Sequence, residues 1–185
     1  MRAFPAARAV RGVGLIEVMI SLVVISIGLL GVAKLNALSI GNSRVSGSRS
    51  MAAVYLGSLS SAMHANGKYW QVPATVSTAR ITLNGRTLGG DGSLSSSTAD
   101  CSYSPDNTAP ACGPLEMASY DLRTWGTSLE QLPSGAGSVL CANAVPVSCV
   151  VTVSWAEKYI ASNAATVAAP TQQMVTQTLS ATVQP

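Results

Sequence analysis

Glu17 is the one ionisable side chain in the apolar stretch from Val13 to Ala33. An unpaired carboxylate in the apolar part of a bilayer costs about 3 kcal/mol, so this residue needs a compensating contact. If the chain were cut after Gly12, Val13 would carry a new amine, cationic near neutral pH with a pKa of about 8. That amine could pair with the Glu17 carboxylate of a neighbouring helix. Alternatively, Glu17 complements the dipole of its own helix and reaches the lipid headgroups.

Four cysteines are the second set of residues with chemistry available to them: Cys101, Cys112, Cys141 and Cys149. Their even number favours disulfides, and the two local pairs, 101 with 112 and 141 with 149, are preferred among the three connectivities. The first bridge would confine a polar loop and the second would close a hairpin. Zinc is disfavoured because neither pair has the two-to-four-residue gap of a thiolate finger.

Catalytic chemistry finds little support in the sequence. His64 is the only histidine, and no serine nucleophile motif accompanies it. We therefore expect no enzyme activity, no cofactor and no metal site. Arg2, Arg8 and Arg11 account for the net charge of +3, so the side chains of the remaining residues sum to zero. No basic surface therefore indicates nucleic-acid binding.

The stretch from Val13 to Ala33 predicts a membrane-spanning helix. At about 1.5 Å per residue it spans roughly the 30 Å hydrocarbon core of a bilayer. An ordinary signal peptide, cut near Ala37, is the alternative, but its apolar region would have only about 7–15 residues. Three basic residues precede the stretch and three follow it (Arg2, Arg8 and Arg11; Lys34, Arg44 and Arg49). Charge therefore leaves the orientation open, whereas the cysteines favour a periplasmic location for the C-terminal part.

An arginine, Gly12, then Leu15, Ile16 and Glu17 at the start of an apolar helix resemble the class III leader of type IV pilins and type II secretion pseudopilins. The resemblance implies that a prepilin peptidase removes residues 1–12 by cutting between Gly12 and Val13. It also implies methylation of the Val13 amine and an assembly salt bridge from Glu17. Val13 and Gly14 depart from the commonest family pattern, which has phenylalanine and threonine there.

After the span, residues 34–66 predict an amphipathic continuation of the same helix. Apolar residues recur at three-, four- and seven-residue steps and no proline interrupts them (Leu38, Val45, Ala52, Leu56, Leu59 and Met63). Asn66 and Gly67 predict its end, with Gly67 in the left-handed conformation.

Residues 67–185 predict a periplasmic globular head. It contains a short strand at 79–83, a variable loop at 84–114 that is rich in turn formers, and an amphipathic helix from Tyr120 to Leu132 capped by Ser119 or Asp121. Strands are expected at 138–141, 149–155 and 175–183, forming an antiparallel meander with one polar face. A surface loop or short helix is expected at 156–170. The predicted fold class is α+β: a long N-terminal helix packed on an antiparallel sheet with disulfide-stapled loops.

Further residues are similar to minor pilins of the PilV kind. They are the stretch 26–31 in the anchor, the tryptophan helix running into Leu132 and Pro133, the glycines at 135 and 137, and the strand 151–155. This resemblance implies a minor pilin that primes or caps a type IV pilus, with roles in twitching motility and surface attachment.

The partners expected from this resemblance are prepilin peptidase, the other minor pilins, the major pilin and the inner-membrane assembly platform. The expected location is a single-pass inner-membrane protein with a periplasmic C-terminal domain, and then the pilus, at its tip, as part of a hetero-oligomeric filament. A minor pseudopilin of a type II secretion system is the alternative function. A membrane-tethered periplasmic binding or hydrolytic protein is a more distant one.

Overall fold

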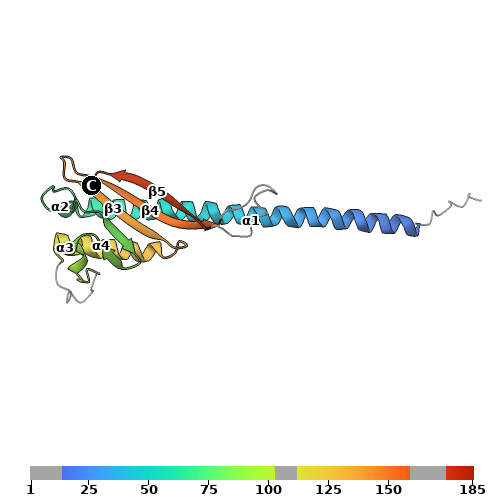
Figure 1. Ribbon diagram of the computed structural model, residues 1–185, viewed down its shortest axis with the longest axis horizontal. Helices are drawn as coiled ribbons and strands as arrows, with labels where there is room; N and C mark the ends of the chain where they lie inside the picture. The colour runs from blue at the N-terminus through green and yellow to red at the C-terminus, as the bar shows by residue number, and fades with distance from the viewer. Residues whose placement is uncertain (1–13, 103–111, 159–173) are drawn as a thin grey trace, which may run out of the picture. The chain divides into compact units, whose positions relative to one another are not determined.

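The computed structural model describes residues 14–102, 112–158 and 174–185 (Figure 1). Along them the elements follow in the order α1 (Leu15–Ala65), α2 (Gly67–Trp70), β1 (Ile81–Asn84), β2 (Thr87–Gly89), α3 (Gly92–Ser96), α4 (Pro114–Leu129), β3 (Ala136–Ala142), β4 (Ser148–Lys158) and β5 (Met174–Val183). The chain divides into two compact units, Met1–Arg44 and Val45–Pro185, which we describe separately.

The long helix is confirmed as α1, which has 51 residues. In the second unit its apolar stripe is buried at Ala52, Leu56, Leu59 and Met63. The predicted stripe began too early, because Leu38 lies in the first unit and is 42% exposed. Periodicity therefore predicted the helix correctly but did not show where its buried face starts.

The end of α1 was predicted at the right place for the wrong reason. The helix stops at Ala65, but Gly67 is not among the described glycines with positive φ; it begins α2 instead. The short α2 buries Tyr69 and Trp70, whose rings meet edge to face. Burial of these two aromatic side chains accounts for the turn after α1 better than the conformational freedom of glycine does.

Five strands form one antiparallel sheet in the order β2-β1-β3-β4-β5. The predicted meander is confirmed as β3, β4 and β5, and the predicted strand at 79–83 is β1, displaced toward its C-terminal end. β4 continues to Lys158, so the expected loop from 156 was wrong at its start, and residues 159–173 lie outside the described residues.

The two faces of the sheet differ as predicted. Along β4, the side chains at 149, 151, 153 and 155 are at most 3% exposed and form the core with the buried stripe of α1 and with α4. The opposite face carries hydroxyl groups, and those of Thr152 in β4 and Ser180 in the neighbouring β5 lie 2.9 Å apart. The head therefore has one layer of helices on one layer of sheet, with the core between them.

α4 starts earlier than predicted. It begins at Pro114, and neither Ser119 nor Asp121 caps it. Instead, Gly113 is the N-cap, and its backbone N–H donates to the Glu116 carboxylate at 2.7 Å. A proline in the first turn followed by an acidic residue is a helix-start signal, which the loop-like composition of the preceding residues obscured.

Trp125 of α4 joins three elements. Its indole N–H donates to the backbone oxygen of Tyr55 in α1 at 2.8 Å. Its ring lies on Gly137 of β3, where a Cβ atom would collide with it. The glycine therefore makes room for the tryptophan and allows α4 to pack closely against the sheet.

The segment 84–114 has more structure than predicted. It contains β2 and α3 and contributes Leu88 and Leu94 to the core. Gly85, with φ of 55°, opens the two-residue turn between β1 and β2, a position that favours glycine. This hairpin glycine was the sequence signal for the missed strand.

Candidate functional site

Glu17 lies in the first turn of α1, as the sequence predicted. Its backbone N–H donates to the Gly14 oxygen at 3.0 Å, and its own carbonyl accepts a bond from the Ser21 hydroxyl at 2.7 Å. The backbone is thus held within the helix, which leaves the side chain to project outward. Among the described residues the Glu17 carboxylate has no hydrogen-bond or ion-pair partner.

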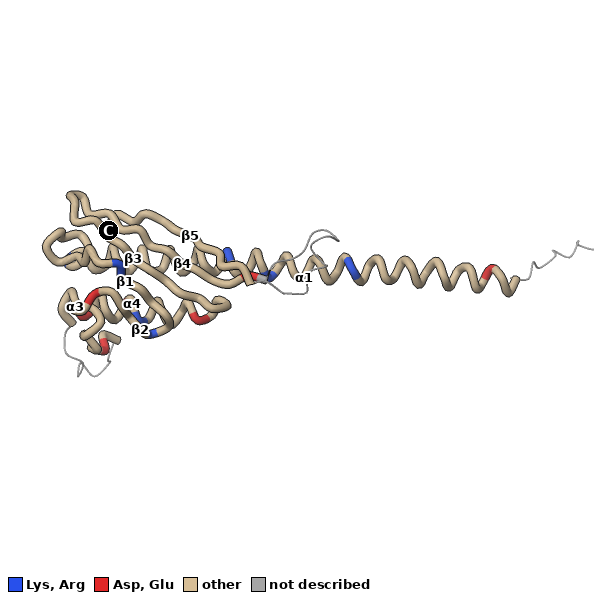
Figure 2. The backbone as a smooth tube through the Cα atoms, in the orientation of Figure 1, with Lys and Arg blue, Asp and Glu red and all other residues tan. Residues whose placement is uncertain are grey.

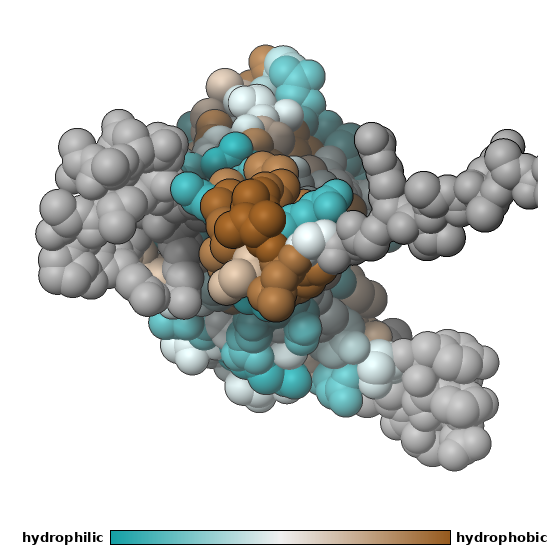
Figure 3. Space-filling model, turned by 90° about the vertical axis from the view of Figure 1, so that its right-hand side faces the viewer, coloured by the Kyte–Doolittle hydropathy of each residue, from teal (hydrophilic) through white to brown (hydrophobic). Residues whose placement is uncertain are grey.

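The surroundings of Glu17 are apolar and uncovered. Large hydrophobic side chains stand exposed all along the first part of α1, among them Leu15 at 81% and Leu30 at 73%. This part of α1 is apolar enough to cross a membrane, and Figure 3 shows hydrophobic side chains gathered at the end of the helix that faces the viewer. A surface of this kind is not stable in water and requires lipid or protein around it.

Charge is sparse along the same helix. Glu17 is the only acidic residue of α1, and Lys34 is its first basic residue. Figure 2 shows the long uncharged stretch of the helix between its acidic and its first basic position. The length and composition are those of a membrane-spanning helix. A carboxylate in such a helix favours a cation supplied by another molecule, because none of the described residues pairs with it.

The other predicted residues of this site, Gly12 and Val13, lie outside the described residues. Their cleavage and methylation therefore stay predictions. What the structure provides is a helix that begins at Leu15, two residues after the expected new terminus.

Comparison with known families identifies this same stretch. Residues 7–33 match the model of the prokaryotic N-terminal methylation motif. The chain is a type IV pilin-like protein with a class III prepilin leader. No curated protein and no solved structure matches the chain. The class III leader of this pilin-like protein implies processing by a prepilin peptidase and assembly with other pilins. Proteins of this family are generally structural and not enzymes.

The cysteines of the pilin-like protein form two disulfides, Cys101 with Cys112 and Cys141 with Cys149. These are the local pairs that the spacing favoured. The first joins the two described ends that flank residues 103–111, and the second links facing residues of β3 and β4. Each bridge closes a short stretch of chain in the head and limits its freedom in the unfolded state.

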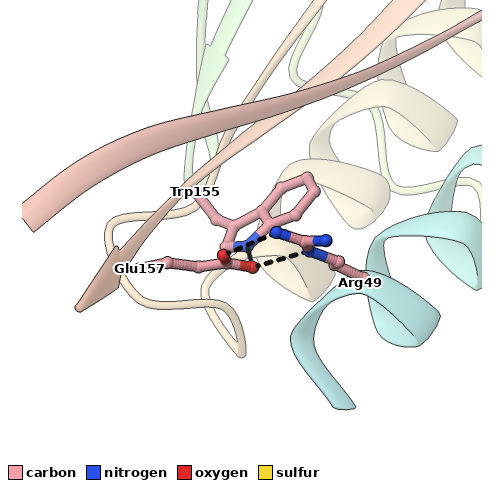
Figure 4. Close-up of polar contacts among 3 residues, drawn as sticks. All are labelled: Arg49, Trp155 and Glu157. Carbon is pink, nitrogen blue, oxygen red and sulfur yellow. Dashed lines mark hydrogen bonds and ion pairs between the residues drawn. The ribbon is translucent and has the colours of Figure 1, made fainter. Parts of the chain in front are cut away.

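Sequence reasoning missed a polar contact between α1 and the end of β4 (Figure 4). Glu157 is 9% exposed, and its carboxylate accepts from Arg49 Nε at 3.3 Å and Nη2 at 3.2 Å, and from the Trp155 indole at 2.8 Å. Burial of this charge is tolerable because both oxygens are bonded. The only hint in the sequence was a glutamate on the inward face of a predicted strand's continuation.

Arg123 and Ser119 of α4 hold the segment 86–97. Arg123 donates to the backbone oxygens of Arg86, Ser95 and Ser97 at 3.2, 2.7 and 3.1 Å. The Ser119 hydroxyl donates to Leu94 at 2.8 Å and is 3.0 Å from the Ser97 oxygen. A segment whose composition predicted a loop is therefore fixed by side chains from another element.

Two further titratable side chains, His64 and Asp121, lie near the end of α1 and in α4. His64 is exposed in the last turn of α1, with its Nδ1 atom 2.7 Å from the Ser60 oxygen. Asp121 borders an open hollow between the ends of α1 and α4, where burial raises the pKa of its carboxyl to about 6. Within the described part of the chain no three metal-binding side chains lie together.

Proposed function

We propose that this pilin-like protein is a minor pilin of a type IV pilus that primes or caps filament assembly. The observation that carries the proposal is the exposed apolar start of α1, in which Glu17 lies within the matched methylation motif and has no partner among the described residues. A free subunit would keep this surface in lipid, and an assembled one would bury it against other helices.

The proposed path leads from the inner membrane to the pilus. The chain enters the inner membrane with its head in the periplasm, where the two disulfides are stable. Prepilin peptidase removes residues 1–12 and the Val13 amine is methylated. Glu17 then pairs with the amine of a neighbouring pilin on the assembly platform, and the subunit joins the pilus near its tip, with residues 13–33 in the filament core.

The same proposal assigns a part to each region. Residues 34–66 continue the helix into the head, and residues 67–185 form the head outside the core. The polar outer face of the sheet supports an exposed position for the head. The other minor pilins and the major pilin are the expected neighbours, and twitching motility and surface attachment are the expected cellular roles.

A minor pseudopilin of a type II secretion system is the second candidate, because the matched leader serves both machines. The likeness of the C-terminal half to minor pilins supports the pilus. Deleting the gene and counting surface pili and secreted proteins in the same cultures tests this choice. We expect pili and twitching to be lost and secretion to be unchanged; normal pili with lost secretion would contradict the proposal.

A further inference from the structure

β5 is a long edge strand of the sheet. All ten of its residues pair with β4 in one continuous register, from Met174 opposite Lys158 to Val183 opposite Cys149. The opposite edge, β2, has only three residues. No other strand among the described residues pairs with β5, so every second residue turns its backbone N–H and C=O groups away from the sheet.

The sequence and register of β5 lack the features that usually protect an edge strand. Its sequence, MVTQTLSATV, contains no lysine, no proline and no charged residue, and the unbroken register leaves no place for a bulge. Proteins normally use such features to prevent a further strand from adding to an edge. β5 therefore has outward-facing backbone N–H and C=O groups with which another extended chain could pair.

The core side of β5 is also incompletely covered. Along β4, the inward side chains from 149 to 155 are almost fully buried, whereas Val183 is the one buried residue of the facing row on β5. Leu179 is only partly buried against the core, Ala181 is exposed and Val175 is 39% exposed. An additional strand with apolar residues at alternate positions would cover this row.

A second copy of this chain fits the edge poorly. In each copy, residues 45–65 run along the sheet (Figure 1). If two β5 strands paired antiparallel, with their core-facing rows on the same side of the joined sheet, residues 45–65 of the two copies would point in opposite directions. Two chains anchored in the same membrane must both run from the membrane toward the head in the same direction. Parallel pairing would keep that direction but would place the apolar row of one copy beside the polar face of the other.

We propose that β5 receives an extended, uncharged strand from a different pilin subunit, which continues the sheet in the assembled filament. This inference rests on the proposed function, because the shared membrane and the packed helices hold the two heads close enough for a weak edge contact to form. The partner strand needs no charge for recognition: its backbone supplies the hydrogen bonds and its apolar side chains cover Val175 and Leu179.

Two neighbouring lysine substitutions test the geometry. Gln177 belongs to the half-covered inward row, opposite Trp155, and Thr178 points to the polar face, opposite Ser154. An added strand would bury the ammonium of Gln177→Lys but would leave that of Thr178→Lys in water. We expect Gln177→Lys to lower the amount of this chain in sheared surface pili by about tenfold or more, and Thr178→Lys to leave it within about twofold.

Photo-crosslinking identifies the partner. p-Benzoylphenylalanine is placed at Thr176 or Ser180 of β5, with Thr124 on α4 as the control, in cells that make pili. Mass spectrometry should find adducts of the two β5 variants with a different pilin subunit and little adduct from Thr124. Both lysine variants should melt like the parent in detergent, and a Gln177→Lys protein that melts lower would have to be replaced by Ala181→Lys, from the same inward row.

The outcomes separate this inference from the proposed function. Equal incorporation of the two lysine variants, with no β5 adduct, would overturn the strand addition and leave the minor pilin proposal standing. Adducts between two copies of this chain would overturn the choice of partner. Absence of the parent chain from surface pili would overturn both proposals.

Discussion

At the scale of single residues, two glutamates show opposite ways of holding a charge. Glu157 is buried but bonded by Arg49 and Trp155, so its charge is satisfied within the head. Glu17 is exposed on an apolar helix and has no partner among the described residues. The first carboxylate stabilises the fold, whereas the second is available to another subunit.

Replacing Glu17 with alanine should impair assembly and leave membrane insertion intact. The substitution removes a charge that is unfavourable in lipid, so insertion should be at least as efficient as before. Co-purification with the other filament subunits should fall by at least about tenfold, because the ion pair is lost. If Glu17 only complements its helix dipole, Glu17→Ala will co-purify and support pili like the parent.

Replacing Asp121 with asparagine should stabilise the head above about pH 6. Burial raises the folded-state pKa of Asp121 from 3.8 to about 6, so the folded head binds a proton that the unfolded chain has already lost. The free energy of unfolding of the parent should therefore fall as the pH rises from about 4 to about 6.

The measurement is urea unfolding of the full chain in detergent at pH 4 and pH 7.5, with tryptophan fluorescence as the signal for unfolding. Asp121→Asn should be more stable than the parent at pH 7.5, by up to about 1 kcal/mol because water reaches this carboxylate, and should match it at pH 4. Glu130→Gln is the control, since Glu130 is exposed. An equal difference at both pH values would rule out titration of Asp121 as the cause.

At the scale of elements, the sequence predicted those whose pattern repeats over many residues. α1 and the strands β3, β4 and β5 have such patterns and were placed to within a few residues. β2 and α3 are three and five residues long and are fixed by contacts from α4, which lies far along the chain. Short elements of this kind carry too little periodicity to be read from local sequence.

The same reason limited prediction of the site. Glu17 stood out because one charge in a long apolar run is a local anomaly. The contact of Glu157 with Arg49 joins residues 108 positions apart, and the local sequence around either residue does not identify the other as its partner. The edge position of β5 depends on the strand order, which local pattern does not specify.

Arg123 provides a test of how α4 holds the segment 86–97. Arg123→Met should lower the free energy of unfolding by about 2 kcal/mol, because three backbone oxygens lose a charged donor. Arg123→Lys should recover only part of the loss, since an ammonium lacks the planar fork. Arg86→Met, at an exposed side chain, should change stability by less than about 0.5 kcal/mol. Equal effects of Arg123→Met and Arg86→Met would contradict this role.

At the scale of the whole molecule, the two units have surfaces suited to different surroundings. The first is an uncovered apolar helix, and the second is a disulfide-bonded head with a buried core and a polar outer face. Lipid before assembly and a helix-packed filament core after it both satisfy the first unit. The periplasm and the cell surface both satisfy the second. A subunit that passes from membrane to filament meets both requirements in turn.

Intact-mass spectrometry of this chain in sheared surface pili from its own host tests the central claim most directly. The account predicts that the chain is present in the pili, that it lacks residues 1–12 and begins at Val13, that it carries one added methyl group, and that both disulfides are intact. A chain that still begins at Met1, one that begins near Ala37 or Leu38, or pili that form normally without this chain would contradict it.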